Sequence, residues 1–591
     1  MAKDFIFTFN GFGGIDRRKN GGDFSACRDM SNFALTKERR LEKREGYLTL
    51  KRDLGSPRGL WCGLLAGEMH YFAVCSVNVY HSLQGFEASE KIGTLPGDKP
   101  VQIFPFGQRV YFLGGAGIRV YDPETGYGRI EPYRPTLTVA TLPNGVGTLY
   151  EDANLLGGKA RQSFSPDGES RVFKLALRDL DSVDFVKING ELLEEGQYSV
   201  NRAEGEVSFS TAPAANAPDS VVIGFTKYSV QNEAMIVNCR RACVYGAGND
   251  TAVFLWGNEA YPDVRCYSGL CDGQPGMEYF PEINRDCVSK GERLTEITRF
   301  YDRLVMFTQD QAYVSYPESY QDALGRTRVR YPIFGLSAAE GCEAIGAAAM
   351  MEELPVTLSR SGLCRWSSTA VRDEKSVSVF SEPIDELLLK KDQKKISLFY
   401  RKTKAWLYIN CPDGDLFIYS PILKEFWLYR GLNAESFFES DDGKLYFLNK
   451  DGDLCFCFGD SDDGKAISAY WSSFENALGY PNNTKDSKWL SLKLSSQGEG
   501  LVTVSRASDV RGEELSNFSS LEFSKGLNFF GFCYADFSKW SFISNEPCSS
   551  FKRRAVTKRF GKMSFKIEAV SDRALRIDSL AVGARLNDRR I

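Results

Sequence analysis

The sequence predicts an all-β protein whose largest part is a β-propeller. Short apolar runs bounded by Gly, Asp, Asn and Pro recur along most of the 591 residues, which is typical of sandwiches, barrels and propellers. Aromatic residues make up 13% of the chain, and Phe and Tyr favour strands. Long amphipathic patterns with helical periodicity are scarce, so we expect little helix.

A recurring hairpin favours the propeller among these architectures. The apolar strand 109–113 is followed by a Gly turn and a second short strand at 117–121, and the same order recurs at 445–448 and 451–455. Each hairpin is half of a four-stranded blade, and radial repetition of blades leaves only short strand edges exposed. The repeat is too degenerate to fix the number of blades, and it lacks the periods of WD and kelch repeats.

Changes in the pattern of predicted strands and turns divide the chain into four parts. Residues 1–141 are expected to hold an N-terminal strand and the first blades, and residues 142–228 an inserted small β-sandwich module. Residues 229–470 supply the remaining blades. Residues 471–591 form a C-terminal β-region, which reads either as a sandwich or as terminal strands that close on the propeller.

Composition narrows the function classes. The formal net charge is -4, from 73 Lys plus Arg against 77 Asp plus Glu, so there is no bulk electrostatic argument for wrapping nucleic acid. No run of about 20 apolar residues occurs, so we expect no membrane span, and the first ten residues look like a strand and not like a signal peptide. The 15 cysteines include no CxxC pair, which favours buried free thiols over zinc or a disulfide framework.

His70 and His81 are the only histidines, so a Ser/His/Asp or Cys/His site would have to use one of them. His70 stands at the head of an alternating strand, which favours a structural role. No GxSxG, HExxH or P-loop motif is present, and Asp and Glu are too numerous to nominate a glycosidase pair. We therefore assign no catalytic, cofactor-binding or metal-binding residue and predict a protein that is not an enzyme and needs no cofactor.

The segment Asp460-Ser461-Asp462-Asp463-Gly464 is similar to a calcium-binding loop in the spacing of its carboxylates. It lacks the bidentate Glu at the position that an EF-hand requires. A solvated turn is therefore the favoured interpretation.

Three basic clusters could contact DNA phosphates or an acidic neighbouring protein. Acidic residues are interleaved with them, which favours an exposed, salt-bridged surface instead. The clusters are Lys37, Arg39 and Arg40 with Lys43 and Arg44; Lys390 and Lys391 with Lys394 and Lys395; and Lys552, Arg553 and Arg554 with Lys558 and Arg559.

The order of motifs at the N-terminus is distinctive. Gly13-Gly14-Ile15-Asp16 precedes Cys27-Arg28-Asp29-Met30-Ser31-Asn32-Phe33, and Leu41-Glu42-Lys43-Arg44-Glu45-Gly46-Tyr47 follows. This order resembles the opening of phage tail proteins and packaged-DNA stabilisation proteins, which continue into a propeller. Stretches at 283–316, 340–366 and 416–456 also look like that family, and the module at 173–228 is similar to a small β-domain of phage tail proteins.

The resemblance implies a structural virion protein that acts as a tail hub, a nozzle or a head-tail connector. Such proteins form a homo-oligomeric ring, here expected to be hexameric, which retains packaged DNA and carries it during ejection. The implied partners are the portal or adaptor, other tail proteins and tail fibres, and the implied location is the virion, assembled in the host cytoplasm. A podovirus nozzle and a siphovirus tail tip both stay open.

The alternative is a phage tail propeller that binds or degrades glycans. It requires paired carboxylates and aromatic platforms in a solvent-lined pocket. The candidate platforms lie in strand-like runs, so core packing is the favoured use of them. They are Trp256, Trp366, Trp406 and Trp427.

Overall fold

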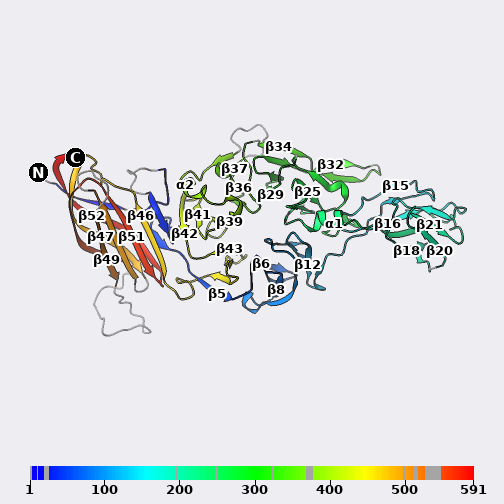
Figure 1. The fold of residues 1–591 in the computed structure, drawn as a ribbon, viewed down its shortest axis with the longest axis horizontal. Coiled ribbons are helices and arrows are strands. Elements are labelled where there is room, and N and C mark those ends of the chain that lie inside the picture. The colour runs from blue at the N-terminus through cyan, green and yellow to red at the C-terminus, as the bar shows by residue number, and fades with distance from the viewer. Residues whose placement is uncertain are drawn as a thin grey trace. The chain divides into compact units, whose positions relative to one another are not determined.

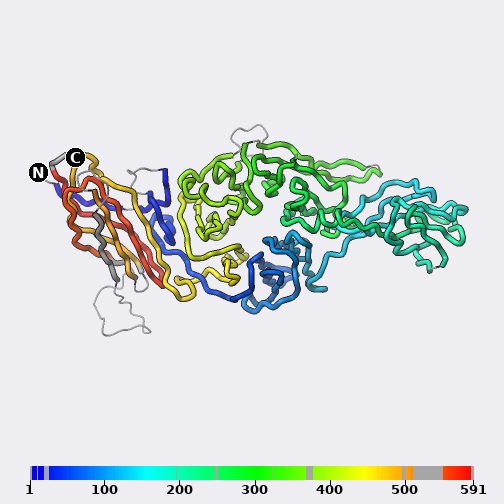
Figure 2. The backbone as a smooth tube through the Cα atoms, viewed as in Figure 1, coloured from blue at the N-terminus to red at the C-terminus, as the bar shows by residue number. Residues whose placement is uncertain are grey.

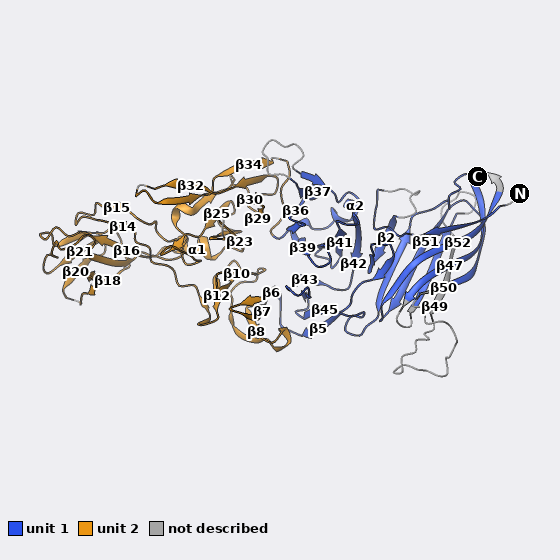
Figure 3. Cartoon of the chain, turned by 180° about the vertical axis from the view of Figure 1, so that it is seen from behind, with its two compact units in different colours: residues 1–57, 346–367, 377–591 blue, residues 58–345, 368–376 orange. Residues whose placement is uncertain are grey.

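The structure is a computed structural model that describes residues 3–9, 11–18, 26–194, 196–246, 250–289, 291–322, 324–337, 339–367, 377–496, 500–509, 517–525 and 548–590. The chain forms two compact units (Figures 1 and 3). Unit 1 comprises residues 1–57, 346–367 and 377–591, and unit 2 comprises residues 58–345 and 368–376. Antiparallel strands dominate both units, which confirms the predicted all-β fold class.

Unit 2 contains four sheets with the up-and-down strand order of propeller blades. The first two are β6 (Pro57–Leu65), β7 (Glu68–Cys75), β8 (Asn78–Ser82) and β9 (Glu90–Thr94), then β10 (Gln102–Phe106), β11 (Arg109–Leu113), β12 (Ile118–Asp122) and β13 (Gly126–Arg129). The next two are β23 (Arg241–Tyr245), β24 (Ala252–Trp256), β25 (Val264–Tyr267) and β28 (Arg285–Cys287), then β29 (Glu296–Phe300), β30 (Arg303–Phe307), β31 (Ala312–Ser315) and β34 (Ile333–Ser337). Two hairpins interrupt these blades before their last strands: β26 (Leu270–Cys271) with β27 (Gln274–Pro275), and β32 (Glu318–Gln321) with β33 (Thr327–Arg330).

Unit 1 contains three more sheets of the same kind. They are β35 (Ala348–Met351), β36 (Leu354–Ser359), β37 (Gly362–Trp366) and β38 (Val377–Val379); β39 (Ser397–Arg401), β40 (Trp406–Asn410), β41 (Leu416–Ser420) and β42 (Glu425–Tyr429); and β43 (Ala434–Glu439), β44 (Leu445–Asn449), β45 (Leu454–Cys457) and β5 (Tyr47–Lys51). The described residues therefore hold seven blade sheets. The sequence repeat was too degenerate to predict this number. The predicted β-propeller is confirmed.

The inner strands of the blades explain the continuous apolar runs in the sequence. Every residue of β24, β41 and β44 is buried, because a strand covered on both faces has no solvent side to carry polar residues. The turn between β40 and β41 places Gly414 at φ +91°, in the left-handed region that glycine adopts without steric cost.

The inserted module is a small sandwich of two sheets, as predicted. A hairpin of β14 (Thr138–Val139) and β15 (Thr148–Leu149) precedes it, one sheet contains β16 (Lys159–Phe164), β22 (Val221–Thr226), β18 (Ser182–Ile188) and β19 (Glu191–Leu192), and the other contains β17 (Val172–Lys174), β21 (Glu206–Phe209) and β20 (Tyr198–Asn201). Phe173 lies between Phe164 and Phe209, with ring centroids 5.4 Å and 5.0 Å away. These edge-to-face contacts form the centre of the module's own core.

A polar clamp fixes the base of this module within unit 2. Arg326, between β32 and β33, donates from Nη2 to the carbonyl of Tyr150 at 2.7 Å and places its guanidinium 4.3 Å from the centre of the Tyr150 ring. Arg328 donates to the same carbonyl at 3.2 Å. The Asp322 carboxylate accepts a hydrogen bond from each arginine, at 2.8 Å and 3.1 Å. We call these four residues the neck clamp.

The C-terminal region is a sandwich that also includes the N-terminal strands. One sheet contains β1 (Asp4–Phe9), β3 (Phe33–Leu35), β4 (Leu41–Lys43), β52 (Leu575–Arg590), β47 (Asn483–Ser496) and β50 (Cys548–Phe560), and the other contains β2 (Cys27–Ser31), β46 (Ile467–Ser473), β51 (Met563–Ser571), β48 (Gly500–Ser508) and β49 (Asn517–Lys525). In Figure 2 the blue N-terminal strand runs beside the red C-terminal strand, as the pairing of β1 with β52 requires. Phe9 of β1 packs against Trp471 and Phe565 of the other sheet, at 6.2 Å and 5.5 Å. We expected residues 1–141 to hold an N-terminal strand and the first blades, whereas the structure places the first four strands in the sandwich.

Helices are short. They are α1 (Val230–Val237), α2 (Asp385–Leu388) and the single-turn helices η1 (Phe86–Ala88), η2 (Glu282–Asn284) and η3 (Gln393–Lys395). The Ser229 side chain caps α1 by accepting the backbone N–H of Asn232. Among the described residues, no helix has the length and apolar character to cross a membrane.

Candidate functional site: the closure junction

Strand β5 completes the last blade sheet with residues from the other end of the chain. Tyr47, Leu48 and Thr49 pair with Cys457, Phe456 and Cys455 of β45. The Tyr47 ring packs edge-to-face on Phe447 at 5.5 Å. The blade is therefore closed by a strand that precedes the first blade in sequence, so this sheet is complete only when two distant parts of the chain meet.

The turn after β45 binds the segment before β5. Arg44 donates from Nη1 and Nη2 to the two carboxylate oxygens of Asp462, at 2.9 Å and 2.6 Å, and the Lys43 ammonium donates to the carbonyl of Asp460. The backbone N–H of Tyr47 donates to the Ser461 carbonyl at 3.1 Å. A Cβ at Gly46 would lie 2.0 Å from that same carbonyl oxygen, so only glycine fits there. We call residues 43–47 and 460–463, together with Asn32, the closure junction.

The same contacts explain the carboxylates of the calcium-like segment. Asp462 is held by Arg44, and Asp463 accepts hydrogen bonds from the backbone N–H and the hydroxyl of Thr49, at 2.8 Å and 2.6 Å. Arg52 adds an ion pair to Asp463 at 2.9 Å. These carboxylates bind the N-terminal segment, a more specific role than the solvated turn that we predicted.

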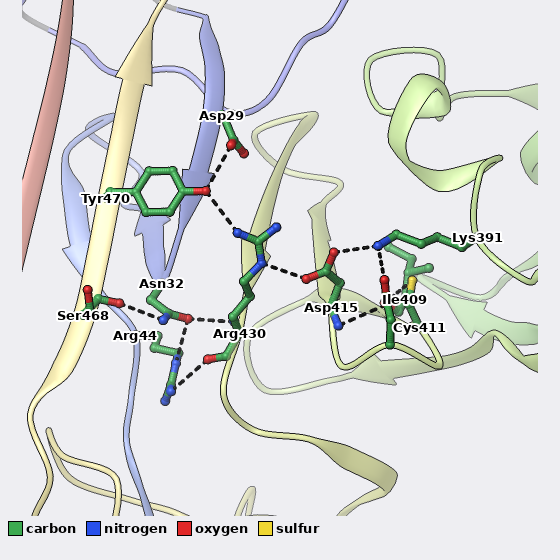
Figure 4. A network of polar contacts seen from close by, with 11 residues as sticks. Asp29, Asn32, Arg44, Lys391, Ile409, Cys411, Asp415, Arg430, Ser468 and Tyr470 are labelled. Carbon is green, nitrogen blue, oxygen red and sulfur yellow. Dashed lines mark hydrogen bonds and ion pairs between the residues drawn. The ribbon is translucent and has the colours of Figure 1, made fainter.

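Asn32 joins three segments at the centre of the junction (Figure 4). Its side-chain carbonyl accepts from Arg44 Nε at 3.0 Å and from the backbone N–H of Arg430 at 2.8 Å. Its amide donates to the carbonyl of Ser468 on β46 at 2.8 Å. One buried side chain thereby ties the N-terminal segment, the end of β42 and the sandwich together, and its φ of 59° is one that Asn tolerates better than most residues.

Arg430 extends the network toward solvent (Figure 4). Its guanidinium donates to Asp415 at 2.8 Å and to the hydroxyl of Tyr470 at 3.1 Å, and that hydroxyl donates to Asp29 at 3.0 Å. Lys391 donates to the other oxygen of Asp415 at 2.7 Å. Burial raises the pKa of Asp415, but the hydrogen bonds from Arg430 and Lys391 outweigh it and hold that pKa below its usual value. The Asp415 carboxylate is therefore ionised, and it connects Arg430 to Lys391.

A cavity of about 20 Å³ lies beside the junction, lined by Glu45, Arg401, Lys404 and Trp406 among others. Arg401 donates to Glu45 at 3.0 Å, and Lys404 donates to the other Glu45 oxygen. Burial raises the pKa of Glu45, and the charges of Lys404 and Arg401 more than compensate, so the pKa is lowered overall. A space of this size holds about one water molecule, so it does not accommodate a sugar ring.

The structure brings the two histidines together in unit 2. His70 Nδ1 and His81 Nε2 are hydrogen-bonded at 3.0 Å, and both rings pack near Phe72 and Tyr121. One imidazole donates and the other accepts, so the accepting ring is neutral at the nitrogen that faces its partner. Burial, followed by the charge of His70, lowers the pKa of His81 to about 4.

The tryptophans bear on the glycan alternative. Trp256, Trp366 and Trp427 are almost fully buried, which confirms the core-packing interpretation for these three. Trp406 is half-buried: its ring meets Trp427 edge-to-face at 5.1 Å, and the Lys404 ammonium lies 4.8 Å from its centre.

The cysteines whose side chains the structure describes are free thiols. There are thirteen of these, and nine of them are buried. Burial raises the pKa of the Cys266 thiol to about 12, so it stays protonated. In the described ranges no three His, Cys, Asp or Glu side chains are placed to hold a metal ion.

Most cations in two of the three basic clusters are salt-bridged. Interleaved acids supply partners in the second cluster, as predicted, whereas the partners in the first are distant in sequence and Arg44 is buried, not exposed. In the first, Arg39, Arg40 and Arg44 pair with Glu425, Asp578 and Asp462. In the second, Lys390, Lys391 and Lys395 pair with Glu386, Asp415 and Asp392. The third cluster lies on β50, and none of its side chains forms an ion pair with a described residue.

Comparisons with known proteins complete the description. No protein family and no curated protein matches the sequence. Solved structures that it is similar to include a chain of the mitotic checkpoint complex (9% identity, TM-score 0.34, covering 70% of this chain and 93% of that chain) and BamB from Moraxella catarrhalis (11%, 0.32, 70% and 97%). YCF48 from Cyanidioschyzon merolae is a third (8%, 0.27, 70% and 98%). Similarity at this level carries no functional inference, and the propeller assignment rests on the blade sheets themselves.

Proposed function

We propose that this chain is a non-enzymatic structural protein of a phage-type virion, part of the tail or of the head-to-tail connection. In this role, copies of the chain form a ring, retain packaged DNA and dock neighbouring tail proteins. Its location is then the assembled particle.

The observation that carries the proposal is the structural role of the N-terminal motifs. The motifs by which the sequence resembles phage tail proteins include Asn32, Arg44 and Gly46, and each of these residues is engaged in the closure junction. The resemblance is thus carried by residues with a defined structural task. A protein that transmits load in a particle needs its terminal segment locked into the blade and sandwich, and the junction provides that lock.

The inserted module supports a docking role for the same protein. It has a hydrophobic core of its own, and the neck clamp fixes its base to a blade hairpin in unit 2. A module with an independent core, braced at its base, can present a surface to a neighbour without disturbing the blades.

Mass photometry of the purified chain tests the proposal, alone and mixed with the portal and tail proteins encoded beside it. We expect a discrete ring-sized oligomer, alone or only with those partners. The closure variant Arg44→Ala should lose it, whereas the exposed-pair variant Arg52→Ala should keep it. A monomer that ignores every virion partner, or a chain that binds or cleaves surface polysaccharide instead, would contradict the proposal and favour the glycan alternative.

A further inference from the structure

Lys552 and Arg554 of the basic cluster on β50 lie on the outer face of the sandwich. Along β47, Leu490, Leu492 and Leu494 are fully buried, so the alternate residues face outward. Trp489 pairs directly with Arg554, and Ser491 pairs with Lys552. Because directly paired residues share a face of the sheet, Lys552 and Arg554 project outward beside Trp489.

These cations are available to a partner. Lys552, Arg554 and Lys558 are exposed, and within the described part of the chain no carboxylate lies within ion-pair distance of any of them. Most cations of the other two clusters, by contrast, form ion pairs with described carboxylates. Along a strand, side chains two residues apart on one face are about 6.7 Å apart, so Lys552 and Arg554 form the start of a regular row of positive charge.

Trp489 adds an aromatic surface to that row. A Cβ at Gly583 would lie 2.1 Å from Trp489 Cε2, so the indole lies flat against the glycine on the neighbouring strand. The Lys552 ammonium is 4.1 Å from the ring centre, which is a cation–π contact. For a base to stack on this indole, the exposed Lys552 ammonium must move off the ring.

We propose that Trp489, Lys552, Arg554 and Lys558 form a binding site for the phosphate backbone of nucleic acid, with preference for single strands. Proteins that bind single strands without sequence preference combine a basic track with aromatic rings on which bases stack. A duplex offers the phosphates but no unpaired base for Trp489. The inference rests on these four residues and does not depend on the proposed virion role.

The position of β50 at the edge of its sheet offers another explanation of these charges, and it makes a different prediction for Trp489. β50 lies at the edge of its sheet, and charged residues on edge strands prevent pairing with another chain. That role needs charge alone and gives Trp489 no part. The two explanations therefore differ in whether the indole responds to a ligand.

Fluorescence anisotropy with a labelled single-stranded oligonucleotide, at about 50 mM salt and upward, tests the site on the full chain. With three phosphate contacts we expect a slope of log K against log salt of roughly -2, since each contact contributes about -0.7 for single strands. Lys552→Ala with Arg554→Ala should weaken binding at least tenfold and reduce the slope to roughly -0.7. The matched control Lys390→Ala with Lys395→Ala removes the same charge from a paired cluster and should leave both values unchanged.

Two further measurements separate the sources of binding. Trp489→Leu should lower single-strand affinity at least fivefold while leaving duplex affinity nearly unchanged, and circular dichroism should show that the variant is folded. Polyglutamate, added at the same concentration of negative charge as the oligonucleotide, should compete poorly with it for the site. The proposal would be overturned by a lack of binding at low salt or by an unchanged affinity in the Lys552/Arg554 variant. It would also be overturned if polyglutamate displaced the oligonucleotide equally well, and that result would favour an acidic protein partner.

Discussion

Arg44 donates two hydrogen bonds to the carboxylate of Asp462, at 2.9 Å and 2.6 Å, across 418 residues of sequence. The Arg44 side chain is 1% exposed, so this fork-to-fork pair is held away from solvent. It joins the segment before β5 to the turn after β45, at the point where the last blade is closed and the sandwich begins. The first two predictions test this relationship.

Arg44→Ala should destabilise unit 1 strongly. Removing one partner of a buried pair leaves the other charge uncompensated and costs about 3–5 kcal/mol. A urea titration followed by tryptophan fluorescence measures the loss as a lower midpoint. Arg52→Ala, which breaks the exposed pair with Asp463, should cost about 0–1 kcal/mol. Equal effects of the two substitutions would show that the buried fork has no special role.

Gly46→Ala should also destabilise the closure junction. The added methyl group would lie 2.0 Å from the Ser461 carbonyl oxygen, so the backbone must shift, at a cost of about 1–3 kcal/mol or more. Gly128 on β13 has open space around its Cβ position and serves as the control. Thermal unfolding of both variants should show a lower midpoint for Gly46→Ala only; a Gly46→Ala midpoint equal to wild type would refute the close approach.

The histidine pair makes unit 2 sensitive to acid. Burial lowers the pKa of both rings in the folded state, that of His81 to about 4, whereas an unfolded histidine titrates near 6.5. Between those values the unfolded chain binds more protons, so stability falls as pH falls, by at most about 1.4 kcal/mol per pH unit for one proton. Above about pH 6.5 the pair contributes no pH dependence.

His81→Phe tests this directly, because Phe can keep the contacts with Phe72 and Tyr121 and cannot be protonated. Denaturant titrations between pH 4 and 7 should show a flatter profile for the variant. Of the groups facing the pair, Glu68 raises the pKa of His70 and opposes the effect. The Glu68→Gln variant should therefore steepen the loss on acidification. A profile that is identical in all three proteins would contradict the assignment.

Arg326→Ala should loosen the base of the inserted module. The substitution removes the 2.7 Å hydrogen bond to Tyr150 and the contact with its ring. Hydrogen–deuterium exchange should become faster around residue 150 and stay unchanged in the module core around Phe173. Lys187→Ala, which removes a cation from another aromatic ring of the module, provides the control. Unaltered exchange near residue 150 would mean that the clamp does not brace the module.

Much of the fold could be predicted because it is encoded locally. Continuous apolar runs such as 416–420 marked strands covered on both faces, and the run of short strands around 182–226 marked the inserted module. The closure junction could not be predicted in this way. Asn32, Arg430 and Tyr470 look like surface residues in sequence, and they form a hydrogen-bonded network only when the residue between β2 and β3, the end of β42 and β46 meet.

The basic clusters show the same limit. Lys390 pairs with Glu386 four residues away, so the interleaved acids were informative there. Arg39 and Arg44 instead pair with carboxylates nearly 400 residues or more distant, and the cations on β50 pair with no described acid although acidic residues occur nearby in sequence. Local charge patterning predicts solvent exposure, whereas pairing depends on tertiary structure.

The most direct test of the proposed function is to search for this chain by quantitative mass spectrometry in purified phage particles produced by cells that carry its gene. The proposal predicts that the chain is present in a fixed, ring-compatible ratio to the portal protein, and that particles assembled without it lose their packaged DNA. Absence of the chain from purified particles, or particles that retain and eject DNA normally without it, would contradict a structural role in the virion.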